Sequence, residues 1–166
     1  GTRAVLDCVQ KGLNAVIVCP SGIIGLHDYA NSLMGDTILS FSGKKISILI
    51  DGAFDFVDVR DVVEGMIKAG NQGKQGEIYI LSGSRVSVEN LHEMAQSAVG
   101  SKSSTVIVPI RLAMLAVTML QRLFSWLKIK TRYTSYSLQT LIDNSSFSSE
   151  KAKLELGYEP RPLSES

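Results

Sequence analysis

A polar turn directly after an apolar stretch is the place in this sequence where binding chemistry is most expected. Ala15 to Cys19 is a continuous apolar run rich in β-branched residues, which predicts a parallel strand covered on both faces. Pro20, Ser21 and Gly22 end the run, because proline lacks an amide hydrogen and glycine tolerates positive φ. In open α/β sheets, ligands lie beyond the carboxyl ends of such strands, so we expect a site over Pro20 to Gly25. The alternative is a plain exit from a strand into a loop.

A glycine-rich stretch, Gly70-Asn71-Gln72-Gly73-Lys74-Gln75-Gly76, matches the spacing of a nucleotide-binding fingerprint. Its context is reversed, because it follows a predicted helix and precedes a predicted strand. A pyrophosphate loop follows a strand and opens a helix, whose N-terminal end holds the phosphates. We therefore interpret this stretch as a turn and not as a cofactor loop.

The elements that would position these residues alternate between helix and strand, which indicates an α/β protein. Helices are expected over residues 2–11, 29–39 (capped by Asp28), 62–69 (capped by Asp61), 88–99 (capped by Ser87 and stopped by Gly100), 110–128, 133–141 and 149–156 (capped by Ser148). Strands are expected over residues 15–19, 45–50, 54–59, 76–81 and 105–108. The helix over 110–128 is apolar on more than one face, which predicts that it is buried or covers another surface.

Composition places the chain among ordinary globular proteins and narrows its partners. Its 166 residues suit one domain, and a formal net charge of +1 gives no electrostatic reason to expect nucleic acid or an anionic membrane. Cys8 and Cys19 are too few for a disulfide framework and are expected to be buried thiols in a reducing compartment. His27 and His92 are far apart, so no metal site is expected, and His92 is expected at the surface. We expect a cytoplasmic protein.

Several landmarks occur together in an order that resembles the extended short-chain dehydrogenase/reductase family, which includes NAD-dependent epimerases, dehydratases and dihydroflavonol-reductase-like enzymes. They are Val16-Ile17-Val18-Cys19-Pro20-Ser21-Gly22-Ile23-Ile24-Gly25, Phe56-Val57-Asp58-Val59-Arg60-Asp61-Val62, Gly76-Glu77-Ile78-Tyr79-Ile80-Leu81, Phe147-Ser148-Ser149-Glu150-Lys151-Ala152 and Leu156-Gly157-Tyr158-Glu159-Pro160. The resemblance implies that residues 1–166 are a single piece: the C-terminal part of an extended Rossmann-type α/β fold, with its substrate-binding region.

Two landmarks of that family are absent from this sequence. No glycine-rich loop lies between a strand and a helix, and no tyrosine is followed four residues later by lysine, as the family's general acid/base pair requires. By the resemblance, the catalytic pair would lie just upstream of Thr2, and the glycine-rich loop belongs to the missing front half. We therefore identify no catalytic residue in this chain, and we expect it to be inactive by itself. The cofactor of the full-length protein would be NAD or NADP.

The resemblance implies a cofactor-binding role for three residues of the turn. Pro20 would shape a wall beside the nicotinamide ring, Ser21 would offer its hydroxyl or its backbone amide to the carboxamide, and Ile23 would pack nearby. An apolar wall is chemically sensible there, because it excludes water from a hydride transfer.

Substrate contacts are expected from His27 and Tyr29 on the loop after the strand, although a solvated loop is the alternative for both. Phe54 occupies the position where sugar-nucleotide epimerases carry an arginine that binds the diphosphate. Arg60 could replace that arginine only if it turned inward, and otherwise it is a structural or surface residue. The apolar Phe54 favours a carbonyl or alcohol substrate of low charge, such as a flavonoid-like, steroid-like or small ketone compound.

Three functions follow as hypotheses. The first is the substrate-binding half of an NAD(P)-dependent oxidoreductase acting on a small carbonyl or alcohol molecule. The second is a fragment of a nucleotide-sugar epimerase or dehydratase, and the third is a noncatalytic binding module that keeps the NAD(P)-binding fold. Apolar strands without their neighbours are templates for association, so a homo-oligomer is expected.

Overall fold

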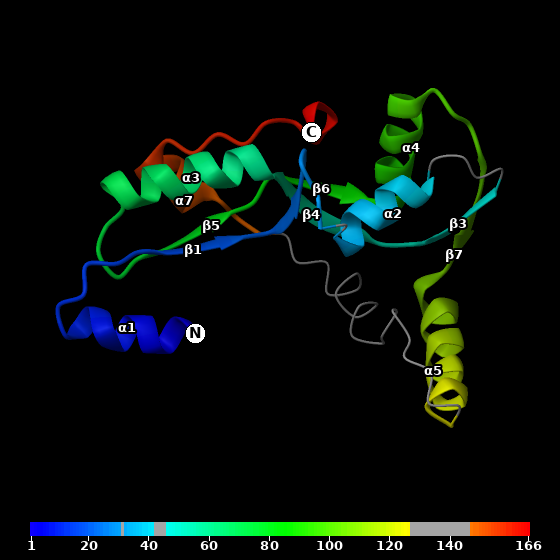
Figure 1. Cartoon of the computed structure of the whole chain (residues 1–166), viewed down its shortest axis with the longest axis horizontal. Helices are drawn as coiled ribbons and strands as arrows, with labels where there is room; N and C mark the ends of the chain where they lie inside the picture. Colours follow the sequence, from blue (N-terminus) through cyan, green and yellow to red (C-terminus); the bar gives the residue numbers. More distant parts are fainter. Residues whose placement is uncertain (31, 42–45, 127–146) are drawn as a thin grey trace. The chain divides into compact units, whose positions relative to one another are not determined.

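The computed structural model describes residues 1–30, 32–41, 46–126 and 147–166 and confirms the predicted α/β class (Figure 1). Its helices are α1 (Thr2–Gln10), α2 (Leu33–Phe41), α3 (Val59–Gln72), α4 (Val88–Val99), α5 (Ile110–Trp126), α7 (Glu150–Leu156) and the 3-10 turn η1 (Leu163–Glu165). Its strands are β1 (Ile17–Pro20), β2 (Gly22–Ile24), β3 (Ile46–Ile50), β4 (Ala53–Asp58), β5 (Ile78–Leu81), β6 (Ser84–Ser87) and β7 (Ser104–Val108).

The chain divides into two compact units. Unit 1 consists of Gly1–Asp28, Asp55–Ser84 and Ser146–Ser166, and unit 2 consists of Tyr29–Phe54 and Arg85–Ser145. Because each unit is assembled from separate stretches of the chain, residues far apart in sequence meet within it. The two units are described one at a time below.

The strands of unit 1 pair in parallel and change partners at a single residue. β1 lies beside β5, with Pro20 opposite Leu81, and β2 lies beside β4, with Ile24 opposite Asp58. Only Ser21 separates β1 from β2, and its amide donates to the Leu81 carbonyl at 3.1 Å. At Ser21, in the predicted turn, the segment β1–β2 therefore stops pairing with β5 and starts pairing with β4.

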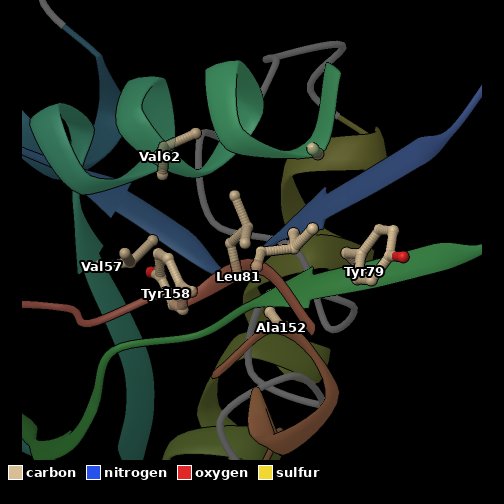
Figure 2. Packing of buried hydrophobic residues seen from close by; sticks show 8 residues of the cluster. Val57, Val62, Tyr79, Leu81, Ala152 and Tyr158 are labelled. Carbon is tan, nitrogen blue, oxygen red and sulfur yellow. The ribbon is translucent and has the colours of Figure 1, made fainter. Parts of the chain in front are cut away.

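The core of unit 1 forms where α3 and the segment around α7 pack on the strands. Figure 2 shows Val57, Val62, Leu81 and Tyr158 converging, and all four are at most 4% exposed. The close packing depends on Gly65, because a Cβ built there would lie 2.6 Å from Leu81 Cδ1. Burial of this cluster is the main hydrophobic contribution to the stability of the unit.

Helix α3 begins directly after β4, which corrects the predicted cap. Asp58, and not Asp61, is the N-cap residue, and its carboxylate accepts a hydrogen bond from the Arg60 amide at 2.7 Å. The helix therefore starts at Val59, three residues before the predicted start. Asp61 lies in the first turn, where it is 3% exposed.

The burial of the strands differs from the sequence expectation. β1 was predicted to be covered on both faces, but it is only half-buried at Ile17 and Val18 and exposed at Cys19 and Pro20. Within the described residues its single strand neighbour is β5, so its other edge is uncovered. In β4, by contrast, residues 55–58 are all buried, because β4 is the middle strand of the order β2-β4-β6. The prediction of buried thiols is also wrong, since Cys8 and Cys19 are both exposed.

Unit 2 contains the parallel pair β3 and β7 with α2 and α4. Helix α2 begins at Leu33, four residues later than predicted, and Ser32 rather than Asp28 lies at its start, where the Ser32 hydroxyl accepts from the Gly35 amide at 3.0 Å. β3 alternates between exposed and buried residues, and its buried residues are Ser47 and Leu49, whereas the isoleucines before each of them are exposed.

Helix α4 confirms the predicted cap and stop and corrects the placement of its histidine. Ser87 accepts from the Asn90 amide, and Gly100 adopts φ +64° at the C-terminal end. His92 is 1% exposed and not on the surface, and its ring lies edge-on to Phe41. Its Nε2 lies 3.2 Å from the Ser103 hydroxyl, whereas its Nδ1 is buried without a hydrogen-bond partner among the described residues.

A polar cluster beneath α4 centres on Ser103. Gln96 donates to the Ser103 hydroxyl at 2.6 Å and accepts from the Ser103 amide at 3.2 Å. Ser47 of β3 lies 3.2 Å from the same hydroxyl. This cluster explains why Ser47, rather than an isoleucine, occupies a buried position on β3.

The strands β2 and β6 and the turn η1 were not predicted from the sequence, whereas the remaining elements agree with the predictions to within one or two residues. β7 extends over Ser104–Val108, and α7 begins at Glu150, one residue later than predicted. Helix α5 is described to Trp126, and the predicted helix over 133–141 lies outside the described residues. No helix in the described ranges is both long and apolar enough to cross a membrane.

Candidate functional site

Ser21 has the feature expected of a ligand-binding residue. Its hydroxyl oxygen is buried and has no hydrogen-bond partner among the described residues. A buried polar group is normally satisfied, so an orphaned hydroxyl at the carboxyl end of a parallel strand fits a site for a polar ligand group. The Ser21 amide, in contrast, already donates to the Leu81 carbonyl. Of the two donors predicted for the carboxamide, only the hydroxyl remains available.

Pro20 and Ile23 flank Ser21 and present apolar surface. Pro20 is exposed, and Ile23 is 45% exposed although it lies in β2 opposite Val57. Exposed apolar residues on both sides of a buried hydroxyl form the surface that the planar, partly apolar nicotinamide ring would need. The described residues therefore fit the predicted cofactor contact, and its occupancy stays a prediction.

Gly25, which we did not single out from the sequence, allows the loop after β2 to lie close to the start of α3. Gly25 has φ +147°, and a Cβ built there would lie 2.7 Å from Val59 Cγ1. His27 follows with φ +67°, an uncommon value for a residue other than glycine. The glycine at the end of the Pro20–Gly25 motif was the available sequence signal for this close approach.

The Arg60 guanidinium is paired with the carboxylate of Asp58. Its Nε and Nη2 donate to the two oxygens of Asp58 at 2.9 and 2.7 Å, and Nη2 also donates to the Glu165 carbonyl at 3.0 Å. This bidentate pairing holds the pKa of the Asp58 carboxyl well below its usual range, against the opposing effect of burial. In this arrangement Arg60 ties the C-terminal tail to the start of α3.

A second pairing, which sequence reasoning missed, joins Asp61 to Arg161. The Arg161 amide and Nε donate to the Asp61 carboxylate at 2.9 and 2.8 Å, and Nη2 lies 2.7 Å from Oδ1. A separation of 100 residues gave no local signal for this contact.

Tyr158 lies in the core beside these carboxylates. Burial, followed by the negative charges of Asp61 and Asp55, raises the pKa of its phenol above the usual value. Its hydroxyl is buried without a hydrogen-bond partner among the described residues. Tyr158 is a member of the buried hydrophobic cluster of unit 1, and it carries none of the predicted site functions.

The predicted site residues are divided between the two units. Pro20, Ser21, Ile23, His27 and Arg60 belong to unit 1, where the β1–β2 turn and the β4–α3 junction place them. The other two predicted substrate contacts belong to unit 2: Tyr29 is 86% exposed, and Phe54 is half-buried in β4.

The described part of the chain gives weaker evidence for any other functional site. No group of three histidine, cysteine, aspartate or glutamate residues there is arranged to hold a metal ion. A surface pocket of about 380 Å³ lies at the end of α4, and residues 93, 96, 97 and 100–102 line it. It contains none of the predicted site residues.

Two curated proteins are similar to this chain in sequence. The chain is 31% identical over 160 residues to sterol demethylase protein B of Methylococcus capsulatus, a match that covers 94% of this chain and 48% of that protein. It is 29% identical over 112 residues to a Synechocystis protein provisionally named a dihydroflavonol 4-reductase, covering 65% of this chain and 33% of that protein. No model of a known protein family matches.

Solved structures agree. The crystal structure of gox2253 is similar with a TM-score of 0.78 and 31% identity, over 98% of this chain and 50% of that one. A nucleoside-diphosphate-sugar epimerase of Pseudomonas aeruginosa is similar with a TM-score of 0.76 and 19% identity, over 99% and 49%. More distant neighbours were solved with NADPH or NAD bound.

These relatives and neighbours are extended short-chain dehydrogenases/reductases, the NAD-dependent epimerase/dehydratase family. The chain belongs to this family and spans about half the length of its relatives. The resemblance inferred from its motifs is therefore confirmed, as is the partial Rossmann-like fold.

Proposed function

We propose that this chain is the substrate-binding half of an NAD(P)-dependent oxidoreductase that acts on a carbonyl or alcohol substrate. The observation that carries the proposal is the Ser21 hydroxyl, which is buried and has no partner among the described residues. It lies between β1, which pairs with β5, and β2, which pairs with β4. The family's cofactor supplies the hydride acceptor or donor. In this chain, Ser21 orients the carboxamide through its hydroxyl, and Pro20 and Ile23 exclude water from one side of the ring.

Two observations support a substrate of low charge. Phe54, at the position where sugar-nucleotide epimerases carry an arginine, offers neither charge nor donor. The names of the curated relatives refer to a sterol demethylase and a dihydroflavonol reductase. His27 and Tyr29 are proposed to contact this substrate from the loop after β2.

A nucleotide-sugar epimerase or dehydratase is the second candidate, favoured by the similarity to a nucleoside-diphosphate-sugar epimerase structure. In that function Arg60 would have to bind a diphosphate. Its guanidinium is already paired with both carboxylate oxygens of Asp58, so binding a diphosphate would require breaking this bidentate, charge-assisted pair. Calorimetry of the full-length protein with cofactor present, titrated with UDP-glucose, UDP-galactose and dTDP-glucose, separates the two candidates. Low-micromolar binding that is abolished by Arg60→Ala would favour the epimerase.

The cofactor contact is tested by Ser21→Ala in the full-length protein. Loss of one hydrogen bond to the carboxamide should weaken NAD(P)H binding about five- to tenfold. Stability should change little, because the hydroxyl has no protein partner to lose. Ser101→Ala is the matched control, since its hydroxyl is also buried and unpartnered but lies in unit 2. Equal cofactor affinity in both variants would refute the assignment.

The activity of the isolated chain offers a further check. We propose that it shows no redox turnover, because neither the acid/base pair nor the glycine-rich loop occurs in its 166 residues. Incubation with NADH or NADPH and a panel of aldehydes and ketones should leave the cofactor absorbance unchanged. The third candidate, a noncatalytic module, would be favoured if the upstream sequence also lacked both features.

We also propose that the protein is cytoplasmic and forms a homo-oligomer. The uncovered edge of β1 supports the second proposal, because an unpaired edge is a template for pairing with another chain. Light scattering over a wide concentration range tests it, and a monomer throughout would contradict it.

A further inference from the structure

The surface pocket of about 380 Å³ at the C-terminal end of α4 is lined by polar groups, one of which is buried without a partner. The pocket lies where α4 ends and the chain turns towards β7 (Figure 1). Ser101 is one of its lining residues, and its hydroxyl oxygen has no hydrogen-bond partner among the described residues. Buried hydroxyls are normally satisfied, so an orphaned hydroxyl in the wall of a pocket indicates a place for a polar ligand.

Gln96 forms a fixed part of the pocket wall. It is 9% exposed, and its side chain donates to the Ser103 hydroxyl at 2.6 Å and accepts from the Ser103 amide at 3.2 Å. Its backbone carbonyl accepts from the Ser101 amide at 3.1 Å, which holds the backbone that carries the orphaned hydroxyl. The wall is therefore preorganised by hydrogen bonds, and only the Ser101 side chain has still to rotate towards a ligand.

Two charged residues of opposite sign line the same pocket. Glu93 and Lys102 are both exposed, and neither side chain forms an ion pair or a hydrogen bond within the described residues. The C-terminal end of a helix carries a partial negative charge, so α4 and Glu93 together attract an ammonium group and repel a simple anion. Lys102 attracts a carboxylate and repels a simple cation. A ligand that satisfies both ends of this pocket must therefore carry both charges.

We propose that this pocket binds a zwitterionic α-amino acid. The ammonium group of the ligand lies towards Glu93 and the end of α4, its carboxylate pairs with Lys102, and the Ser101 hydroxyl donates to that carboxylate. Because Glu93 and Lys102 are exposed, each ion pair contributes little, and we expect a dissociation constant in the millimolar range. All residues of the pocket belong to unit 2, so this site is separate from the proposed cofactor contact in unit 1.

Titration of the full-length protein with L-alanine, followed by NMR of its backbone amides, tests the proposal. The amides of residues 100–102 should shift and reach saturation. Ser101→Ala should weaken binding about five- to tenfold without destabilising the protein, because the hydroxyl has no protein partner to lose. Glu93→Gln and Lys102→Gln should each weaken it about two- to fivefold. Glu89→Gln is the matched control, because Glu89 is an exposed acid on the same helix that does not line the pocket.

Propylamine and propionate separate a zwitterion site from a site for a simple ion. Each carries one of the two charges of alanine, and each should bind at least about fivefold more weakly than L-alanine. Three results would overturn the proposal. The first is the absence of saturable shifts at residues 100–102, and the second is an affinity for propylamine or propionate equal to that for L-alanine. The third is unchanged affinity in Ser101→Ala.

Discussion

The ion pair between Asp61 and Arg161 should make a large, measurable contribution to stability. Asp61→Asn keeps the size of the side chain but removes the charge that receives two guanidinium contacts, Nε at 2.8 Å and Nη2 at 2.7 Å. Asp61 is 3% exposed, so its contacts are little screened by water, whereas the 28% exposure of Arg161 lets its guanidinium recover part of its hydration. Hydrogen bonds to charged groups contribute about 1.5–3 kcal/mol each, and rehydration offsets part of that, so we expect a loss of about 2–3 kcal/mol. For a chain of this length the melting temperature should fall by about 5–10 °C.

A double-mutant cycle distinguishes this pair from a general loss of packing. Arg161→Met, alone and combined with Asp61→Asn, should give a coupling energy of about 1–3 kcal/mol in urea unfolding followed by circular dichroism. Hydrogen exchange supplies a local readout, because amides of residues 158–166 should lose protection when the tail is released from α3. Glu64→Gln is the control: it breaks the exposed pair with Lys68 on the same helix and should leave the unfolding midpoint unchanged.

The reasoning would be refuted by additive effects of the two substitutions. Additivity would mean that the contact contributes no interaction free energy, despite its geometry. Unchanged protection of residues 158–166 would equally show that the C-terminal tail is held by other contacts.

Four further substitutions have expected outcomes. Asp58→Asn keeps an acceptor for the helix cap but removes the charge that pairs with the Arg60 guanidinium, so it should destabilise the protein by about 2–3 kcal/mol at neutral pH. Because the folded pKa of Asp58 is lowered, the wild-type advantage is present above about pH 4 and is lost as the pH falls towards that pKa, which unfolding midpoints across acid pH will show. Tyr158→Phe should leave stability unchanged or raise it by about 1 kcal/mol, since it removes an orphaned buried hydroxyl, and calorimetry that finds a large loss would reveal a partner for that group. Ser103→Ala should cost about 1–3 kcal/mol in urea unfolding, because three buried polar side chains lose their common partner. Gly83→Ala should cost about 3 kcal/mol or prevent folding, because its Cβ would lie 2.3 Å from a backbone carbonyl oxygen, and a normal melting curve would contradict this.

Local patterns predicted the elements whose signals lie within a few neighbouring residues. The cap and stop of α4 were predictable because the Ser87 hydroxyl and the left-handed Gly100 act over one helical turn. The start of α3 was misplaced because Asp58 and Asp61 are both capping residue types, and only the position of the strand end decides between them.

Burial was less predictable because it depends on neighbours distant in sequence. The apolar run in β1 implied coverage on both faces, but coverage requires elements beyond β5 that the described residues do not supply. His92 carries no local sign of burial, because its partner Ser103 and its ring neighbour Phe41 come from other segments.

The position of the candidate site could be predicted from the sequence, but which of its hydrogen-bond donors are free to bind a ligand could not. The spacing of the Pro20–Gly25 motif located the turn, and the family resemblance supplied a role for it. Only the structure shows that the Ser21 amide is used by Leu81 while the hydroxyl is not. Likewise, the pairing of Arg60 with Asp58 follows from the rotation of the first turn of α3, which a motif does not encode.

The direct junction between β4 and α3 has a mechanical consequence. Asp58 is both the residue paired with Ile24 across the strands and the cap of the helix, with no loop residue in between. A helix joined to a strand through a loop can pivot independently of the sheet, whereas this one has no hinge. Any tilt of α3 must therefore be passed to the end of β4, to its neighbour β2 and so to the segment that follows Ser21. Force applied to the helix, by a bound ligand or by the tail that Arg60 and Asp61 hold, would therefore be transmitted to the proposed cofactor contact.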